Sequence, residues 1–227
     1  MMVDPRKGQV KRRYDSSRRR ERSAATRART LDCGRALLLA DGYAATTVTS
    51  IAADAGVSPE TVYRLFGGKA GLVRAICEHA LEGAGPVPAQ QRSDLLQVTE
   101  RDALTVIRGW SALIAEVSPR ISPVLLLVRA AAAVDAEMAE LRAALDDARL
   151  DRMTHNAESL LRSGQVRLGV TRRDAAEILW AYTAPEWYEM LVVDRGWTPT
   201  KYADFVTDSI AAALLGHRQG PPVQRPV

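Results

Sequence analysis

The chain has 227 residues, of which 47% are hydrophobic and 26% charged, and its formal net charge is +4. This length allows one or two domains with buried cores. No stretch of about 20 apolar residues occurs, and no apolar segment closely follows the basic N-terminus, so we expect no membrane span and no signal peptide. The two cysteines have no metal or redox spacing, and we expect a cytoplasmic protein without a metal or other cofactor.

Positive charge is concentrated at one end of the chain. The first 30 residues contain eleven Lys or Arg and three Asp or Glu, whereas the remaining residues are acidic overall. Such an asymmetry favours a polyanion that contacts the N-terminal part. Residues 1–24 also lack apolar periodicity, and we expect them to form a disordered basic arm. The arm would follow a phosphate backbone or lie in a minor groove through Arg18, Arg19, Arg20 and Arg22, and the alternative is a solvated tail.

Residues 47–66 predict two short helices joined by a tight turn. In the first helix, apolar residues recur at helical spacing at Val48, Ile51, Ala52 and Ala55. Gly56 allows the positive φ that the end of this helix requires. Ser58 supplies a capping oxygen, and Pro59 supplies a fixed φ at the first position of the second helix. The pattern predicts a helix-turn-helix, and either Thr46 or Thr47 caps its first helix.

The second helix of this motif has a free face that suits the major groove of DNA. Its N-terminal residues reach base edges, and its neighbours reach phosphates. We expect the DNA-binding residues to be Thr47, Thr49, Ser58, Pro59, Glu60, Thr61, Tyr63, Arg64 and Lys69. Of these, Thr49, Pro59 and Glu60 would face bases, and Ser58, Thr61, Tyr63, Arg64 and Lys69 would hold phosphates. Glu60 either accepts a hydrogen bond from a cytosine amino group or lowers affinity by repelling phosphate.

The run GYAATTVTSIAADAGVSPETVYRLFGGKAGLVRAI, residues 42–76, resembles the DNA-binding domain of the TetR family of bacterial repressors. The resemblance covers residues 27–80. It implies an all-α fold, with an N-terminal three-helix domain (residues 25–82) that contains the helix-turn-helix. A helical effector-binding and dimerisation domain (residues 83–218) follows, and the Pro-rich residues 219–227 should form a disordered tail. Arg35, Gly68 and Ala70 depart from the family, which usually has apolar, polar and acidic residues at or near these places.

The Gly- and Pro-rich residues 83–88 predict a linker, and the sequence after it has a helical pattern. We expect helices over about residues 95–117, 124–134, 135–162 and 171–193, and a last helix that reaches Leu215. Pro119 and Pro123 should separate the first two of these helices.

Aromatic residues of the second domain indicate an effector pocket. A cavity for an apolar small molecule would be lined by Trp110, Trp180 and Trp187, with Arg129 or His155 as a polar anchor. Packing in a core or an interface is the alternative for each aromatic residue. Arg129 has apolar neighbours in the sequence, so it should have an internal acidic partner or bind an anionic ligand group.

The last two expected helices have wide apolar faces, formed by Ile178, Trp180, Leu191 and Val192 and by Phe205, Val206, Ile210 and Leu214. Pairing with the same helices of a second copy would bury both faces in an isologous four-helix interface, as the resemblance also implies. The alternative is a core within one chain. A short DNA-binding helix has little binding surface by itself, which favours a homodimer.

These features predict a transcriptional regulator. We expect a repressor that binds a palindromic operator as a homodimer and is released by an unknown small-molecule effector. Activation of transcription stays open, because the position of the operator decides whether a bound regulator represses or activates. The alternative is a non-specific architectural DNA-binding protein that uses the basic arm. An enzyme is not expected, because His79, His155 and His217 lie far apart and no Ser-His-acid spacing or Gly-rich phosphate loop occurs.

Overall fold

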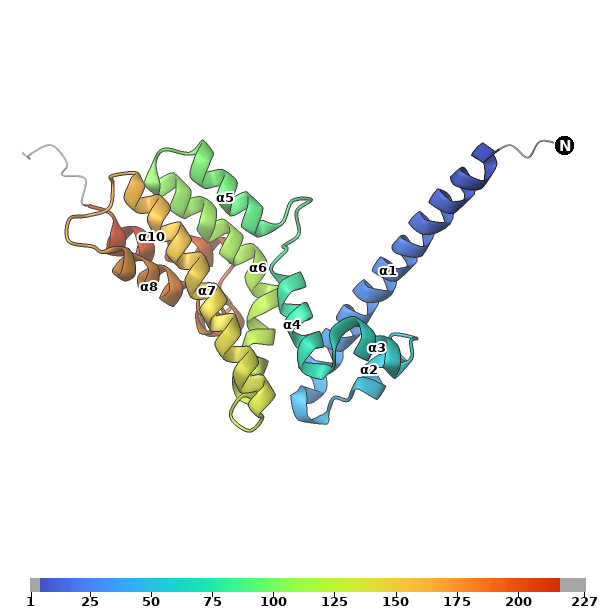
Figure 1. The fold of residues 1–227 in the computed structure, drawn as a ribbon. Coiled ribbons are helices and arrows are strands. Elements are labelled where there is room, and N and C mark those ends of the chain that lie inside the picture. The colour runs from blue at the N-terminus through green and yellow to red at the C-terminus, as the bar shows by residue number, and fades with distance from the viewer. Residues whose placement is uncertain (1–4, 217–227) are drawn as a thin grey trace, which may run out of the picture. The chain divides into compact units, whose positions relative to one another are not determined.

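The computed structural model describes residues 5–216, with side chains from residue 17 onward (Figure 1). These residues form a π-helical segment η1 (Glu189–Val193) and the helices α1 (Pro5–Ala45), α2 (Val48–Asp54), α3 (Pro59–Phe66), α4 (Lys69–Ala80), α5 (Ala89–Thr99), α6 (Ala103–Ala131), α7 (Ala136–Arg162), α8 (Arg172–Tyr182), α9 (Pro185–Tyr188) and α10 (Pro199–Leu214). Between residues 5 and 216, the sole strand-like pairing is an isolated antiparallel bridge between Val166 and Leu215. The predicted all-α fold is confirmed.

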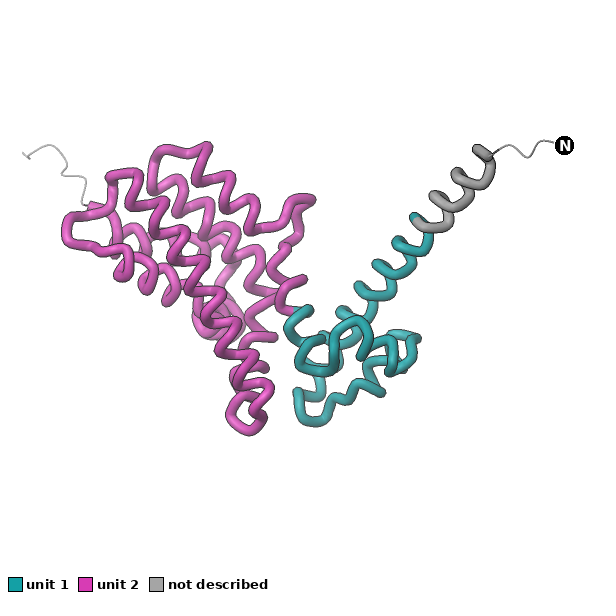
Figure 2. The backbone as a smooth tube through the Cα atoms, viewed as in Figure 1, with its two compact units in different colours: residues 1–76 teal, residues 77–227 magenta. Residues whose placement is uncertain are grey.

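The chain divides into two compact units, residues 1–76 and residues 77–227 (Figure 2). The division falls within α4, a few residues before the domain boundary that the sequence predicts. The expected C-terminal tail, residues 219–227, lies outside the described residues, as do residues 1–4.

Helix α1 is longer than predicted. It begins at Pro5, and its backbone is non-helical only at Gly42 (φ 80°, ψ 166°), where the sequence predicts its end. The prediction of disorder is therefore wrong for residues 5–24. The lack of apolar periodicity does correspond to solvent exposure, since residues 18–25 are all exposed. Arg, Lys, Glu and Ala nevertheless have high helix propensity, and lengthening an existing helix avoids the cost of nucleation.

The helices of the first unit pack around a small apolar core. Its largest fully buried side chains are those of Leu38, Ile51, Val62, Leu72 and Val73. Gly71 lets the start of α4 approach the end of α3, because a Cβ atom here would overlap the carbonyl oxygen of Phe66. This close packing holds α3 in one orientation relative to α2 and α4.

Helix α6 is the central helix of the second unit and packs against α5, α7, α9 and α10 (Figure 1). It runs unbroken through Pro119 and Pro123, so the predicted break between residues 117 and 124 is wrong. Ser118 directly precedes Pro119, and its hydroxyl donates to the carbonyl oxygen of Ile114 at 2.7 Å. Burial of apolar side chains along the whole helix offsets the backbone hydrogen bonds that proline removes.

Length and composition alone would let α6 cross a membrane. The helix has 29 residues, and 44% of its most apolar 18-residue window is buried within the unit. Its contacts with four neighbouring elements are typical of a core helix in a helical domain.

Two other predicted helices are divided in the structure. The helix expected over residues 95–117 is α5 followed by α6, and Asp102 caps α6 by accepting a hydrogen bond from the Thr105 N–H at 2.9 Å. The helix expected over residues 171–193 begins as predicted, with Thr171 and Asp174 in a capping box. It stops at Tyr182 because Pro185 has no N–H to continue the helix, and α9 and η1 follow.

Candidate functional site

Thr47 caps the N-terminus of helix α2. Its hydroxyl accepts a hydrogen bond from the Ser50 N–H at 3.0 Å, and the Ser50 hydroxyl accepts one from the Thr47 N–H at 3.1 Å. Thr46 is instead buried and donates to the carbonyl oxygen of Gly42 at 2.8 Å. The structure therefore selects Thr47 as the cap, and Thr49 lies exposed in the first turn of α2.

The turn between α2 and α3 has the predicted geometry. Gly56 has a φ of 63°, and Ala52, at the crossing of the two helices, is 1% exposed. Ser58 accepts a hydrogen bond from the Thr61 N–H at 3.4 Å, and Pro59 is the first residue of α3. These local contacts fix the start of α3 and the direction of its outer face.

The outer face of α3 is exposed and polar. Glu60, Tyr63 and Arg64 are exposed, Pro59 and Thr61 are partly exposed, and Val62 is completely buried on the opposite face. The Ser58 hydroxyl and a backbone N–H donate to the carboxylate of Glu60 and lower its pKa. Glu60 therefore carries a negative charge at neutral pH, in the middle of a surface that the sequence assigns to DNA.

The side chain of Lys69 makes hydrogen bonds and a cation–π contact within the first unit. Its ammonium group donates to the carbonyl oxygens of Tyr43 at 2.8 Å and Thr46 at 3.0 Å, and it lies 3.8 Å from the centre of the Tyr43 ring. Lys69 thus joins the end of α1 to the start of α4, which sequence reasoning missed. Its expected contact with phosphate depends on the third N–H of the ammonium group.

A second basic residue that sequence reasoning missed stabilises the motif. The Nε atom of Arg29 donates to the carbonyl oxygen of Ala55 at 2.7 Å, where a helix C-terminus favours a cation. Arg27 covers the ring of Phe66, with 4.9 Å between the guanidinium carbon and the ring centre. Both residues hold α1 to the ends of α2 and α3.

The arginines expected in the arm, Arg18, Arg19, Arg20 and Arg22, are exposed on α1. The helical backbone changes how they would meet DNA. An α-helix with its side chains is about 10–12 Å wide, whereas the minor groove of B-DNA is about 6 Å wide. A helical arm therefore fits contact with the phosphate backbone and does not fit within a minor groove.

The five residues expected to line an effector pocket have different surroundings, and only His155 lines the cavity between α5 and α7. Trp110 is 4% exposed in the core, and its Nε1–H faces the carbonyl oxygen of Ser93 at 3.5 Å. Trp187 packs against Phe205, with 5.5 Å between ring centres, and donates to the carbonyl oxygen of Ala181. For these two residues the structure favours the packing alternative.

Arg129 and Trp180 take part in ionic and cation–π contacts. Arg129 pairs with Glu186, so the structure supplies the internal acidic partner that the sequence left open. Arg149 lies 4.2 Å from the centre of the Trp180 ring and donates to Asp146 at 3.1 Å. Burial lowers the pKa of the Arg149 guanidinium, an effect that the negative charge of Asp146 opposes.

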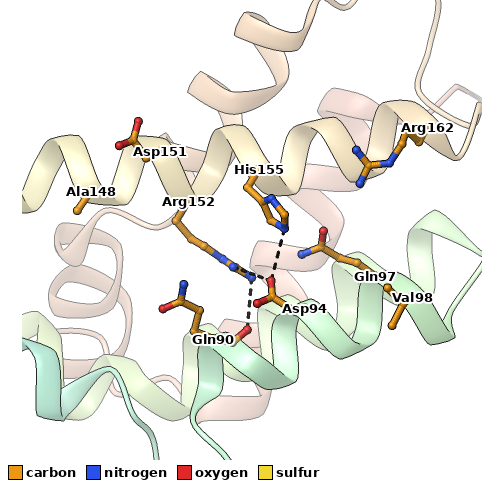
Figure 3. A pocket seen from close by; sticks show the side chains of 9 residues that line it. All are labelled: Gln90, Asp94, Gln97, Val98, Ala148, Asp151, Arg152, His155 and Arg162. Carbon is orange, nitrogen blue, oxygen red and sulfur yellow. Dashed lines mark hydrogen bonds and ion pairs between the residues drawn. The ribbon is translucent and has the colours of Figure 1, made fainter.

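His155 lines a groove between α5 and α7 with a volume of about 700 Å³ (Figure 3). The groove does not contain the other four expected pocket residues. Seven of its nine lining residues have polar or charged side chains: Gln90, Asp94, Gln97, Asp151, Arg152, His155 and Arg162, with Val98 and Ala148 as the apolar members. Sequence reasoning missed it, because its two walls lie about 60 residues apart in the chain. Within residues 17–216, no three His, Cys, Asp or Glu side chains are grouped to hold a metal ion.

Comparison with known proteins gives matches to the first unit and to the fold. Residues 31–76 match the family model for bacterial regulatory proteins of the tetR family. A Bacillus subtilis protein, the uncharacterized HTH-type transcriptional regulator YvkB, is 40% identical over 70 residues, which cover 31% of this chain and 37% of YvkB. The match thus spans little more than a third of that relative.

Solved structures resemble the chain over most of its length. The complex of SmeT with triclosan has a TM-score of 0.67 at 23% identity and covers 89% of this chain and 98% of SmeT. SmeT is described as the repressor of the Stenotrophomonas maltophilia multidrug efflux pump SmeDEF. NalD, the secondary repressor of the MexAB-OprM multidrug efflux pump in Pseudomonas aeruginosa, has a TM-score of 0.67 at 19% identity and covers 87% of this chain and 99% of NalD. At these identities the likeness shows the fold alone.

Proposed function

We propose that the chain, whose residues 31–76 match the family model for bacterial regulatory proteins of the tetR family, is a transcriptional regulator of that family that binds a palindromic operator as a homodimer. The proposed action is repression, relieved by a small-molecule effector, without enzymatic activity and in the cytoplasm. The observation that carries the proposal is the outer face of α3, which is exposed and polar and is fixed by the Ser58 cap and the buried Val62.

The proposed contacts with DNA divide into two groups. Thr49, Pro59 and Glu60 would face base edges, and Ser58, Thr61, Tyr63 and Arg64 would hold phosphates, with Thr47 and Lys69 beside them. Their exposure on α2 and α3 supports this division for all but Lys69, which has internal partners. The exposed arginines of α1 would add phosphate contacts that do not depend on sequence.

The proposed dimer would form through α8, α9, η1 and α10. Val206, Ile210 and Leu214 are buried within the chain, so this part of the expected interface serves the core. A half-exposed aromatic cluster, formed by Tyr182, Trp187, Trp197 and Phe205, lies beside them. We propose that the aromatic cluster meets its copy across a two-fold axis, since aromatic residues are enriched at such interfaces.

A gel-shift assay with inverted repeats from the DNA beside the gene tests the proposed function. We expect one repeat to be shifted selectively in the presence of excess competitor DNA. Arg64→Ala should weaken this binding about tenfold or more, and Arg108→Ala, which removes an exposed arginine from the second unit, should not. Equal binding to every duplex would support the non-specific architectural alternative instead.

Sedimentation of the full chain tests the dimer. We expect a dimer for the wild-type protein and a monomer for Phe205→Glu, because the new carboxylate would be buried between the two copies. Circular dichroism should show unchanged helix content for the variant. A wild-type monomer at working concentrations would contradict the proposed dimer.

A further inference from the structure

The groove between α5 and α7 has two walls of different chemistry. On α5, Gln90, Asp94 and Gln97 follow one helix face, and on α7, Arg152, His155 and Arg162 follow the facing one (Figure 3). The α5 wall thus offers neutral amides and one carboxylate. The α7 wall offers two guanidinium groups and an imidazole.

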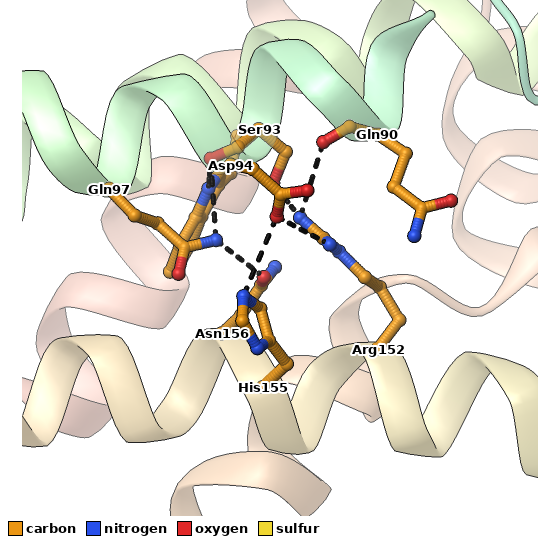
Figure 4. Close-up of polar contacts among 8 residues, drawn as sticks. Gln90, Ser93, Asp94, Gln97, Arg152, His155 and Asn156 are labelled. Carbon is orange, nitrogen blue, oxygen red and sulfur yellow. Dashed lines mark hydrogen bonds and ion pairs between the residues drawn. The ribbon is translucent and has the colours of Figure 1, made fainter.

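Internal hydrogen bonds already engage some of these groups (Figure 4). Arg152 pairs with Asp94 at 2.6 Å and donates to the hydroxyl of the buried Ser93 at 2.7 Å. The Nε2 atom of His155 lies 3.5 Å from the same Asp94 carboxylate. Gln97 donates to the side-chain oxygen of the buried Asn156 at 3.0 Å. This network joins the two helices at the floor of the groove and compensates the charge of Asp94.

Outside this network the lining contains one guanidinium group, that of Arg162, and one carboxylate, that of Asp151. Arg162 lies at one end of the lining, and the second ring nitrogen of His155 and the amide of Gln90 add hydrogen-bonding capacity. Asp151 belongs to the rim, and its carboxylate points away from Asp94 across α7 (Figure 3). Two guanidinium groups therefore face one inward carboxylate, which favours an anionic ligand.

We propose that this groove binds a small polar molecule that carries a carboxylate or phosphate group, with Arg162 as the partner of the anion and His155 as a neighbouring hydrogen-bonding group. The amides of Gln90 and Gln97 would hydrogen-bond the rest of the molecule. A ligand without polar groups is disfavoured, because it would separate these side chains from water without replacing their hydrogen bonds.

The ligand would touch both α5 and α7, so binding would bias the separation of these helices. Helix α5 directly follows the linker after α4, and the linker is itself held by Glu116, which accepts hydrogen bonds from the Ala84 N–H and from Arg92. As an effector site the groove rests on the proposed function. The ligand could change the affinity for DNA only as far as its own affinity differs between the state of the protein that binds DNA and the state that does not.

Calorimetry on the full chain without DNA tests the binding itself. The probes are citrate and glutamate as carboxylates, inorganic phosphate and glucose 6-phosphate as phosphates, and glucose as the neutral control, all at matched ionic strength. We expect at least one oxyanion to bind and glucose not to bind. Binding by none of the four oxyanions overturns the proposal, and the class that binds distinguishes a carboxylate from a phosphate ligand.

Three variants locate the site and the sign of the ligand charge. Arg162→Gln should weaken binding about tenfold, and Arg108→Gln, an exposed arginine outside the groove, should leave it unchanged. Asp94→Asn should tighten binding several-fold, because it removes the inward negative charge. Weaker binding by Asp94→Asn, or equal weakening by Arg108→Gln, overturns the proposed site.

A gel shift with the probe that binds then tests regulation. We expect the probe to lower operator affinity for the wild-type protein and to have a smaller effect on Arg162→Gln. Probe binding without any change in operator affinity would overturn the effector role. A protein that binds no operator would leave the calorimetric result unaffected, so the two failures are distinguishable.

Discussion

Arginine side chains have different surroundings in the two units. In residues 1–76, Arg19, Arg22 and Arg64 are exposed on α1 and α3. In residues 77–227, Arg92 pairs with Glu116 on α6, and Arg152 pairs with Asp94 on α5. Exposed guanidinium groups release counterions when they meet a polyanion, whereas paired groups fix one helix to another. Under the proposed function, these exposed arginines of α1 and α3 serve DNA binding, whereas the paired Arg92 and Arg152 fix helices of the second unit to one another.

The largest effect should come from the arm. Replacing Arg18, Arg19, Arg20 and Arg22 by Gln keeps helix propensity but removes four phosphate partners. We expect operator affinity to fall more than 100-fold at about 150 mM salt, and the salt slope to become shallower by about 0.9 for each phosphate that is no longer neutralised. Fluorescence anisotropy across a salt series measures both quantities.

A matched variant separates local binding from overall charge. Arg101, Arg108, Arg167 and Arg195 are exposed in the second unit, and their replacement by Gln removes the same net charge. This variant should change the slope little. An equal fall in slope for both variants would show that net charge, and not the helical arm, attracts DNA.

A smaller effect, on stability, should come from Glu116→Gln in the second unit. Both oxygens of Glu116 accept hydrogen bonds from Arg92, and one also accepts the Ala84 N–H. Neutralising this carboxylate should lower the free energy of unfolding by about 1–3 kcal/mol in urea titrations. Glu177→Gln, which breaks an exposed pair with Arg173, should leave the stability unchanged.

The same carboxylate predicts a pH dependence. The Arg92 guanidinium, followed by the Ala84 N–H, lowers the pKa of Glu116 to about 2 from an ordinary value of 4.5. Its stabilising contribution is therefore complete above pH 4.5 and is lost as the pH falls toward 2. Glu116→Gln should show a shallower loss of stability over this range, and parallel curves for the two proteins would contradict the assignment.

Arg29 is an exception in this comparison, because it is an arginine of the first unit with a structural role. Arg29→Gln removes the hydrogen bond to the carbonyl oxygen of Ala55. We expect the free energy of unfolding to fall by about 1 kcal/mol. Arg74→Gln, at an exposed position of α4, is the matched control and should have no effect on stability. If the two variants were equally stable, the hydrogen bond at Ala55 would contribute nothing.

Local signals explain why the helix-turn-helix was predictable from the sequence. Gly56, Ser58 and Pro59 act within a few residues of their own positions, and the structure places each as predicted. In the second unit, packing against distant helices overrides such signals. Pro119 and Pro123 should end a helix, yet burial along α6 keeps it continuous.

The groove between α5 and α7 could not be predicted from the sequence either, because it is formed by residues that are distant in the chain. Asp94 and Arg152 lie on different helices, and nothing in the local sequence pairs them. The prediction of an aromatic pocket counted Trp110 and Trp187 by residue type, whereas their indole N–H groups face backbone carbonyl oxygens in packed surroundings. Which polar side chains line a cavity depends on the rotation of each helix, and sequence periodicity gives that rotation only relative to the apolar core.

Glu60→Ala should give the smallest and most informative change. Glu60 is an acidic exception on the exposed face of α3, and its lowered pKa keeps it charged in the neutral range. If Glu60 accepts a hydrogen bond from a cytosine amino group, the variant should lose preference at one base pair of each half-site by a few-fold. If the carboxylate only repels phosphate, the variant should bind all sequences more tightly, with the same preferences. Selection from a randomised operator library, followed by affinity measurements on the enriched sites, separates these outcomes. A variant with unchanged affinity and unchanged preference would show that Glu60 does not lie near DNA. The proposed orientation of α3 in the major groove of DNA would then need revision.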